Sequence, residues 1–253
     1  MTTQIRVVRC RFAVALMLLA GTLGSTALAA DTVPVEGDTR DQKVLSTRTF
    51  LNAHPDLKHR TEGWVAYEAG DHAQAMQEFK RAALYADKLS QAMVAELLWK
   101  GLGVVADRAA AYAWSDIAAE RGYPTFVRLR EQYWSQLDET DRRRALEVGA
   151  ALLAEYSDAV ARPRMAEFLR KAVRKDRFSS VSLRPPKEIR VPGPTGSMIR
   201  IPSHRFYAKH YWDPVQYEAW QDSLWMPPKE GQVDVGDVQQ VNAPVQQDAP
   251  PED

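Results

Sequence analysis

Hydrophobic and polar positions recur with helical spacing through the middle of the chain, from Thr61 to about Lys175. This stretch is rich in Ala, Leu and Glu and has few prolines, so we expect it to be nearly all helix. The predicted helices span roughly 61–69, 72–86, 89–101, 107–121, 124–136, 139–157 and 161–175. Because short loops join them, consecutive helices should be antiparallel neighbours.

Polar side chains mark the expected starts of several of these helices. Asp71 is placed to cap a helix, with Gln74 three residues further on, and Asp138 stands in the same relation to Asp141. Pro163 is expected in the first turn of the last predicted helix, where a missing N–H costs nothing.

The chain also resembles itself at two related offsets. Gly63 and Tyr67 fall opposite Ala95 and Trp99 at an offset of 32 residues. At an offset of 36 residues, Ala75, Ala82 and Ala83 fall opposite Ala111, Ala118 and Ala119. The change of four between the offsets predicts a loop four residues longer between the helices of the second unit. A repeat of this length with two helices per unit is typical of a helical-hairpin solenoid.

The second unit has the pattern Val94-Ala95-x-x-Leu98-x-x-Gly101-x-Gly103-Val104-x-x-Asp107-x-x-x-Ala111-x-x-Trp114-x-x-x-Ala118-Ala119-x-x-Gly122. This pattern resembles one complete Sel1-like repeat. The first unit, with Gly63, Gly70, Ala75, Phe79 and Ala82, is similar to a tetratricopeptide repeat, which is the same hairpin with a shorter loop. The resemblance covers about residues 61–122 and implies an extended concave surface for binding partners. The helices after Pro124 lack the consensus, and they are predicted to form either a degenerate repeat or the cap that ends a solenoid.

Outside the helical repeat the composition changes. Seven residues of Pro or Gly between Pro185 and Pro202 break any helix. The loop Gly193–Ser197 lacks the lysine of a phosphate-binding loop and is predicted to be a turn between two short extended segments.

The predicted fold class is all-α: a short antiparallel helical-hairpin solenoid with a mostly irregular, Pro-rich C-terminal extension. The expected divisions are a flexible lead-in over 31–57, a helical repeat domain over 58–176, an irregular extension with one short aromatic helix over 177–238, and a disordered acidic tail over 239–253.

The first 30 residues have the plan of a secretory signal peptide. Arg6, Arg9 and Arg11 precede a short apolar run, and Ala27-Leu28-Ala29 precedes the expected cleavage site. We therefore expect export to the periplasm or secretion, without a membrane span after cleavage. Cleavage would remove Cys10, the one cysteine, and would leave 30 basic and 33 acidic residues. This balance argues against general nucleic-acid binding.

The sequence offers little support for catalysis. The sequence has five histidines that form no HExxH or similar set, so we expect no metal and no cofactor: His54, His59, His72, His204 and His210. A Gly-x-Ser-x-Gly nucleophile motif is also missing. Pairs of carboxylates do not indicate acid–base catalysis unless a pocket brings them together. The protein is predicted not to be an enzyme.

Aromatic residues are the candidates for binding a protein or peptide partner. If the first helix of each hairpin lines the concave face, Trp64, Tyr67 and Trp99 are the expected contacts. A second aromatic group lies between Phe206 and Trp225, where Asp213, Pro214 and Gln216 predict the start of a short helix. Its candidate contacts are Trp212, Tyr217 and Trp220. Either aromatic group could instead pack inside the protein, the first between hairpins and the second on the end of the solenoid.

The predicted function is an exported interaction module, a scaffold or adaptor of the bacterial cell envelope. The alternative is an envelope enzyme or binder acting on cell-wall peptide or glycan.

Overall fold

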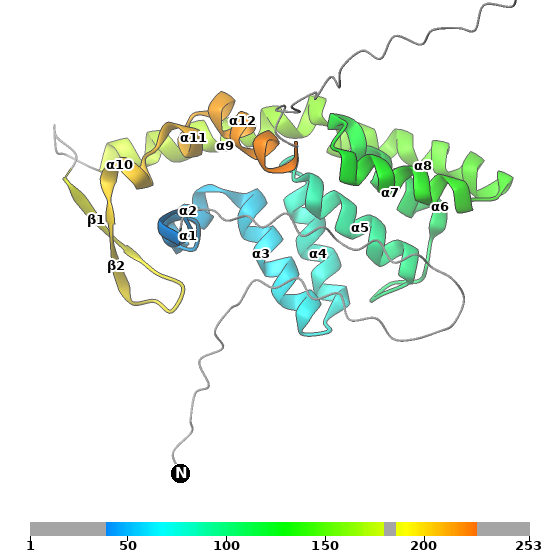
Figure 1. The fold of residues 1–253 in the computed structure, drawn as a ribbon, viewed down its shortest axis with the longest axis horizontal. Coiled ribbons are helices and arrows are strands. Elements are labelled where there is room, and N and C mark those ends of the chain that lie inside the picture. The colour runs from blue at the N-terminus through cyan, green and yellow to red at the C-terminus, as the bar shows by residue number, and fades with distance from the viewer. Residues whose placement is uncertain (1–38, 180–185, 227–253) are drawn as a thin grey trace, which may run out of the picture. The chain divides into compact units, whose positions relative to one another are not determined.

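The computed structural model describes residues 39–179 and 186–226, and Figure 1 shows the elements in chain order. These residues form two compact units. Of the described residues, the larger unit contains 53–179 and 207–226, and the smaller unit contains 39–52 and 186–206. The predicted signal peptide and acidic tail lie outside the described residues.

Helix pairs build the larger unit, as the helical periodicity predicts. Its helices are α3 (Pro55–Glu68), α4 (His72–Ala83), α5 (Lys88–Lys100), α6 (Arg108–Ala118), η1 (Ala119–Arg121), α7 (Pro124–Gln136), α8 (Glu139–Tyr156), α9 (Asp158–Ser179), α11 (Lys209–Trp212) and α12 (Pro214–Trp225). Helix α3 packs on α4 and α5 packs on α6, while α7 and α8 both pack on α6. The predicted all-α helical-hairpin fold is confirmed.

The two hairpins differ in loop length as the offsets predict. The loop between α3 and α4 holds three residues, and the loop between α5 and α6 holds seven. Small residues let the paired helices approach closely: a Cβ at Gly63 on α3 would lie 2.7 Å from the Phe79 ring on α4. The longer loop also touches the first hairpin, because a Cβ at Gly103 would lie 2.5 Å from the backbone nitrogen of Ala73.

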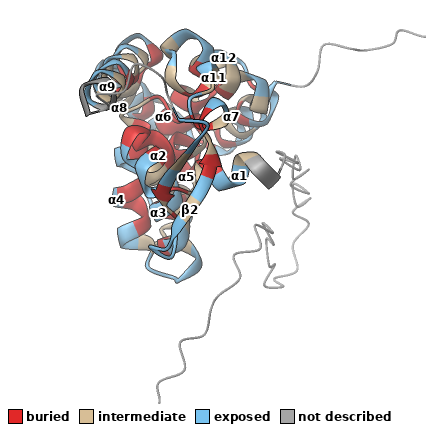
Figure 2. Ribbon diagram, turned by 90° about the vertical axis from the view of Figure 1, so that its left-hand side faces the viewer, coloured by how far each residue is buried: buried red, intermediate tan, exposed pale blue. Residues whose placement is uncertain are grey.

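The main core of this unit lies between the hairpins. Helix α5 is buried at most of its positions (Figure 2). Phe79, Val94, Leu97 and Trp114 belong to one buried cluster, and Ala118 and Ala119 belong to a second cluster with Tyr123 and Phe126. Burial of these side chains supplies most of the stabilisation expected of such a solenoid, at roughly 25 cal/mol per Å² of apolar surface.

The start of α9 corrects one prediction. Helix α9 begins at Asp158 rather than near residue 161, so Pro163 lies inside the helix and beyond its first turn. The carboxylate of Glu120 accepts a hydrogen bond of 2.8 Å from the backbone N–H of Asp158. This bond from η1 satisfies a free amide of the first turn and fixes the start of the helix.

The smaller unit also differs from the prediction. The segment expected to be a flexible lead-in over 31–57 contains α1 (Thr39–Leu45), α2 (Arg48–Ala53) and the start of α3. Thr47 explains part of this order, because its hydroxyl accepts a hydrogen bond of 3.2 Å from the backbone N–H of Phe50 in the first turn of α2. The Phe50 ring is fully buried and packs edge-on against Phe206 at 6.4 Å between centroids.

The predicted extension over 177–238 is more regular than expected. It contains strands β1 (Glu188–Pro192) and β2 (Met198–Pro202), the short helix α10 (Ser203–Phe206), and helices α11 and α12. The strands pair antiparallel, with Ile189 opposite Ile201 and Val191 opposite Ile199. Gly193–Ser197 forms the turn between them, as predicted. Prolines end both strands of this two-stranded sheet, where a missing amide N–H is tolerated.

Candidate functional site

A cavity of about 290 Å³ lies inside the larger unit, between α9 and α12. Met165, Ala166 and Leu169 of α9 form one wall, and Tyr217 and Gln221 of α12 contribute to the other. The loop between α4 and α5, the first turn of α3, and the segment around η1 supply further lining through Asp87, Asp56 and Arg121. The cavity therefore combines an apolar wall with polar groups that come from five parts of the chain.

Buried ion pairs build the side of the cavity next to η1. Arg121 donates two hydrogen bonds to the carboxylate of Asp158, from Nε at 2.7 Å and from Nη2 at 3.0 Å. The ammonium of Lys88 lies 3.0 Å from both Asp158 and Glu120, and it donates to the carbonyl oxygen of Ile117 at 2.8 Å. Burial alone would raise the pKa of Asp158, but Arg121 and Lys88 outweigh it and hold this pKa below its ordinary value.

Hydroxyl–carboxylate pairs dock α12 over the cavity. The Tyr123 hydroxyl donates to Asp222 of α12, and Arg121 Nη1 donates to the same carboxylate at 3.2 Å. In the opposite direction, the Tyr217 hydroxyl of α12 donates to Asp56 Oδ2 of α3 at 2.6 Å. Gln221 Nε2 in turn donates to the Tyr217 hydroxyl at 2.9 Å. Two tyrosines thus tie the C-terminal helix to the repeat through hydrogen bonds to carboxyl groups.

Asp56 is the most unusual group at the site. Its carboxyl is buried, and its second oxygen, Oδ1, has no hydrogen-bond partner. Burial raises the pKa of Asp56 to about 7, against an opposing effect of the Tyr217 hydrogen bond and with an added contribution from nearby Asp87. Asp87 itself forms an ion pair of 2.9 Å with Arg60 and caps α5. A buried oxygen without a partner in a cavity wall is a group that a ligand's hydrogen-bond donor would satisfy.

One backbone conformation next to Asp87 is also unusual. Ala86 has a φ of 65°, which an L-residue other than glycine rarely adopts. Its carbonyl oxygen accepts a hydrogen bond of 3.3 Å from Arg121 Nη2. The loop between α4 and α5 is therefore held in a strained shape where it lines the cavity.

The aromatic residues predicted as partner contacts lie in several places. Trp64 and Tyr67 are neighbours on α3, with ring centroids 5.6 Å apart, and both pack against the main core. Trp99 stacks on Tyr133 at 4.0 Å, and the Arg108 guanidinium lies 5.2 Å from the Trp99 ring. These three side chains are partly buried, and their role in binding stays a prediction.

The second aromatic group stands closer to the cavity. The predicted helix start is confirmed, because Asp213 caps α12 by accepting from the backbone N–H groups of Val215 and Gln216. Tyr217 is buried and lines the cavity, whereas Trp220 packs edge-on against Tyr211 at 5.2 Å and Trp212 packs on His54 at 5.2 Å. The sequence drew attention to Tyr217 as an aromatic residue, but it gave no sign of Asp56, Arg121 or Asp158 as its companions.

Comparison with known proteins found a match to one solved structure. No protein-family model and no curated protein matches the chain. The structural match, at 19% identity and a TM-score of 0.38, is a protective antigen present in uropathogenic Escherichia coli strains that displays an SLR fold. The match covers 52% of this chain and 27% of that one, so the chain spans about a quarter of the length of the protein it resembles.

Proposed function

We propose that this chain is an exported helical-repeat module that binds a protein or peptide partner and receives part of that partner in the cavity between α9 and α12. The observation that carries the proposal is the cavity itself, one of whose lining residues, Asp56, has a buried Oδ1 without a hydrogen-bond partner. Concave sites with an apolar lining and a few convergent polar groups are the usual places where proteins bind ligands.

The size and lining of the cavity limit what can enter. At about 290 Å³ it is at the small end of ligand sites, which suits one amino-acid side chain or a chain end rather than a whole folded surface. Met165 and Leu169 favour an inserted side chain that is mainly apolar, and Asp56 favours a hydrogen-bond donor at the end of that side chain. Val215, which is 77% exposed at the rim, adds apolar surface for the residues on either side of the inserted group.

Export is the part of the proposal that rests on the sequence alone. The basic start, the apolar run and Ala27-Leu28-Ala29 support cleavage after residue 29 or 30. Among the described residues, the helices are too short or too polar to cross a membrane. Intact mass spectrometry of the protein from fractionated cells tests this part, because a full-length cytosolic product would contradict it.

A second candidate function is catalysis on cell-wall peptide or glycan, and one observation favours it. Burial brings the pKa of Asp56 to about 7, which is suited to proton transfer at neutral pH. Tyr217 and Gln221 from the C-terminal segment converge on the same cavity. Turnover of cell-wall fragments by the wild type, lost in Asp56→Asn, would favour this candidate over simple binding.

The binding proposal is tested by filling the cavity. Ala166→Trp places a large ring in the wall, whereas Ala159→Trp places the same ring at an exposed position of α9 outside the cavity. Each variant is crosslinked in the envelope of its own cells, and the crosslinked species are compared with those of the wild type. We expect Ala166→Trp to lose species that Ala159→Trp retains. Identical species in both variants, with both proteins folded, would refute the cavity as the binding site.

A further inference from the structure

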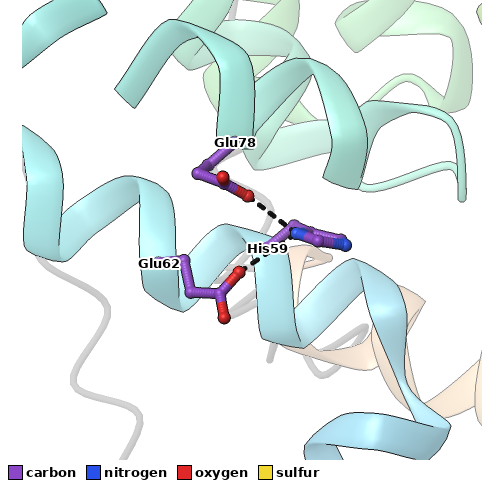
Figure 3. A group of neighbouring side chains, drawn as sticks. All are labelled: His59, Glu62 and Glu78. Atoms are coloured by element: carbon purple, nitrogen blue, oxygen red, sulfur yellow. Dashed lines mark hydrogen bonds and ion pairs between the residues drawn. The ribbon is translucent and has the colours of Figure 1, made fainter. Parts of the chain in front are cut away.

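Three side chains of the first hairpin converge on one point away from the cavity lining (Figure 3). His59 and Glu62 lie one turn apart on α3, and Glu78 comes from α4. The Nδ1 atom of His59 lies 2.7 Å from Glu78 Oε2 and 3.1 Å from Glu62 Oε2. The three possible ligand atoms all lie within 4.8 Å of one another. Folding of the hairpin therefore assembles one imidazole and two carboxylates.

A single proton on His59 cannot serve both neighbouring carboxylates fully. The Nδ1 atom of a histidine carries at most one hydrogen, yet two carboxylate oxygens approach it. A divalent cation in place of that hydrogen would accept electron pairs from all three side chains. It would also offset the negative charge of Glu62, whereas Glu78 already forms an ion pair with Arg81.

The surroundings of Glu78 hold its carboxylate in position. Its other oxygen, Oε1, accepts hydrogen bonds from Gln74 Nε2 at 2.8 Å and from Arg81 Nη1 at 2.6 Å. Outer partners of this kind orient the carboxylates that bind metals. The side chain of Glu78 is only 5% exposed, whereas that of Glu62 is 47% exposed. The group is thus anchored on its inner side and open to solvent on its outer side.

We propose that His59, Glu62 and Glu78 bind a zinc ion. Zinc takes histidine nitrogen and carboxylate oxygen at about 2.0 to 2.2 Å, and it prefers four ligands. A nitrogen donor with only two carboxylates is a poor match for magnesium or calcium, which prefer oxygen ligands in larger number. Three protein ligands leave the fourth position to water or to a donor atom of a bound partner. No short sequence motif marks these three residues, because Glu78 lies on the next helix.

The first test is a zinc titration of the purified full chain without an affinity tag, after removal of metal by a chelator. Glu62→Gln removes one ligand at a half-exposed position, so the fold should be kept. Glu68→Gln is its matched control on the exposed side of α3. We expect one zinc per chain in the wild type and in Glu68→Gln, and an affinity at least about tenfold lower in Glu62→Gln.

The second test replaces zinc with cobalt(II), whose visible absorption reports its ligands. We expect His59→Ala to abolish the spectrum of the bound ion, and His204→Ala, at an exposed position of the smaller unit, to leave it unchanged. Circular dichroism checks that each variant is folded. The proposal is overturned if the wild type binds neither ion, or if Glu62→Gln and His59→Ala bind them as the wild type does.

Discussion

The buried carboxyl of Asp56 makes the stability of this protein depend on pH in an unusual direction. The pKa of this group rises from an ordinary 3.8 to about 7 in the folded chain, mainly because burial disfavours the charged form. The folded state therefore holds a proton that the unfolded state releases between these two values. The contribution of Asp56 to stability should therefore be greatest below about pH 4, should fall as the pH rises towards 7, and should then level off.

The size of the effect follows from the two pKa values. One pKa unit corresponds to about 1.4 kcal/mol, so the ionised Asp56 lowers the free energy of unfolding by up to about 4 kcal/mol above pH 7. Asp158 and Asp107 act in another window, because their pKa values are lowered in the folded chain. The stability that they contribute is present above about pH 4 and is lost as the pH falls below it.

Asp56→Asn isolates the contribution of this one group. The amide has nearly the same shape and can still accept the hydrogen bond from Tyr217, but it cannot ionise. Urea unfolding at pH 4.5, 6 and 8 measures the free energy of unfolding of both proteins, with Glu68→Gln as an exposed control. We expect the variant to gain stability over the wild type as the pH rises, and to exceed it clearly at pH 8. A variant less stable than the wild type at pH 8 would show that the folded protein needs the carboxylate, and would refute the reasoning.

Two further substitutions test the packing of the repeat. Ala118 is fully buried, so Ala118→Leu should lower the free energy of unfolding by about 1 to 3 kcal/mol in thermal or urea unfolding, and an unchanged midpoint would contradict the repeat register. Gly103→Ala should destabilise more than Gly70→Ala: both glycines have positive φ, but only the methyl group at position 103 would collide with the backbone of α4. Equal losses in the two alanine variants would mean that this close approach is unimportant.

The repeat could be predicted from sequence because its signals are local. Asp71 and Asp138 cap their helices through hydrogen bonds of 3.0 and 2.8 Å to backbone amides three residues on, as their positions indicate. The difference of four residues between the two inter-helix loops follows from the change in offset alone. The predicted start of the last helix, based on Pro163, was wrong. Glu120 fixes the start of α9 through a hydrogen bond to Asp158, which lies 38 positions later, and no local sequence pattern connects the two residues.

The sequence also failed to predict that the N-terminal segment is helical and that β1 and β2 pair as strands. Residues 31–57 show little periodicity, and α1 and α2 are too short to reveal any. The prolines of β1 and β2 lie outside helices, as predicted. At the ends of strands, however, the same residues are compatible with pairing.

The cavity shows where prediction from a single sequence stops. Its polar contacts join residues far apart in the chain: Tyr217 and Asp56 are separated by 161 positions, and Tyr123 and Asp222 by 99. The sequence places Tyr217 in an aromatic segment and leaves open whether its ring packs or contacts a partner. It says nothing about the phenol oxygen, whose acceptor is chosen by the way α12 lies on the repeat. That choice matters energetically, because a buried carboxyl group without a hydrogen-bond partner is costly. The contacts of the Tyr217 hydroxyl, together with the Tyr123–Asp222 pair, therefore help to dock the C-terminal helix, and they determine which polar groups of Asp56 remain for a ligand.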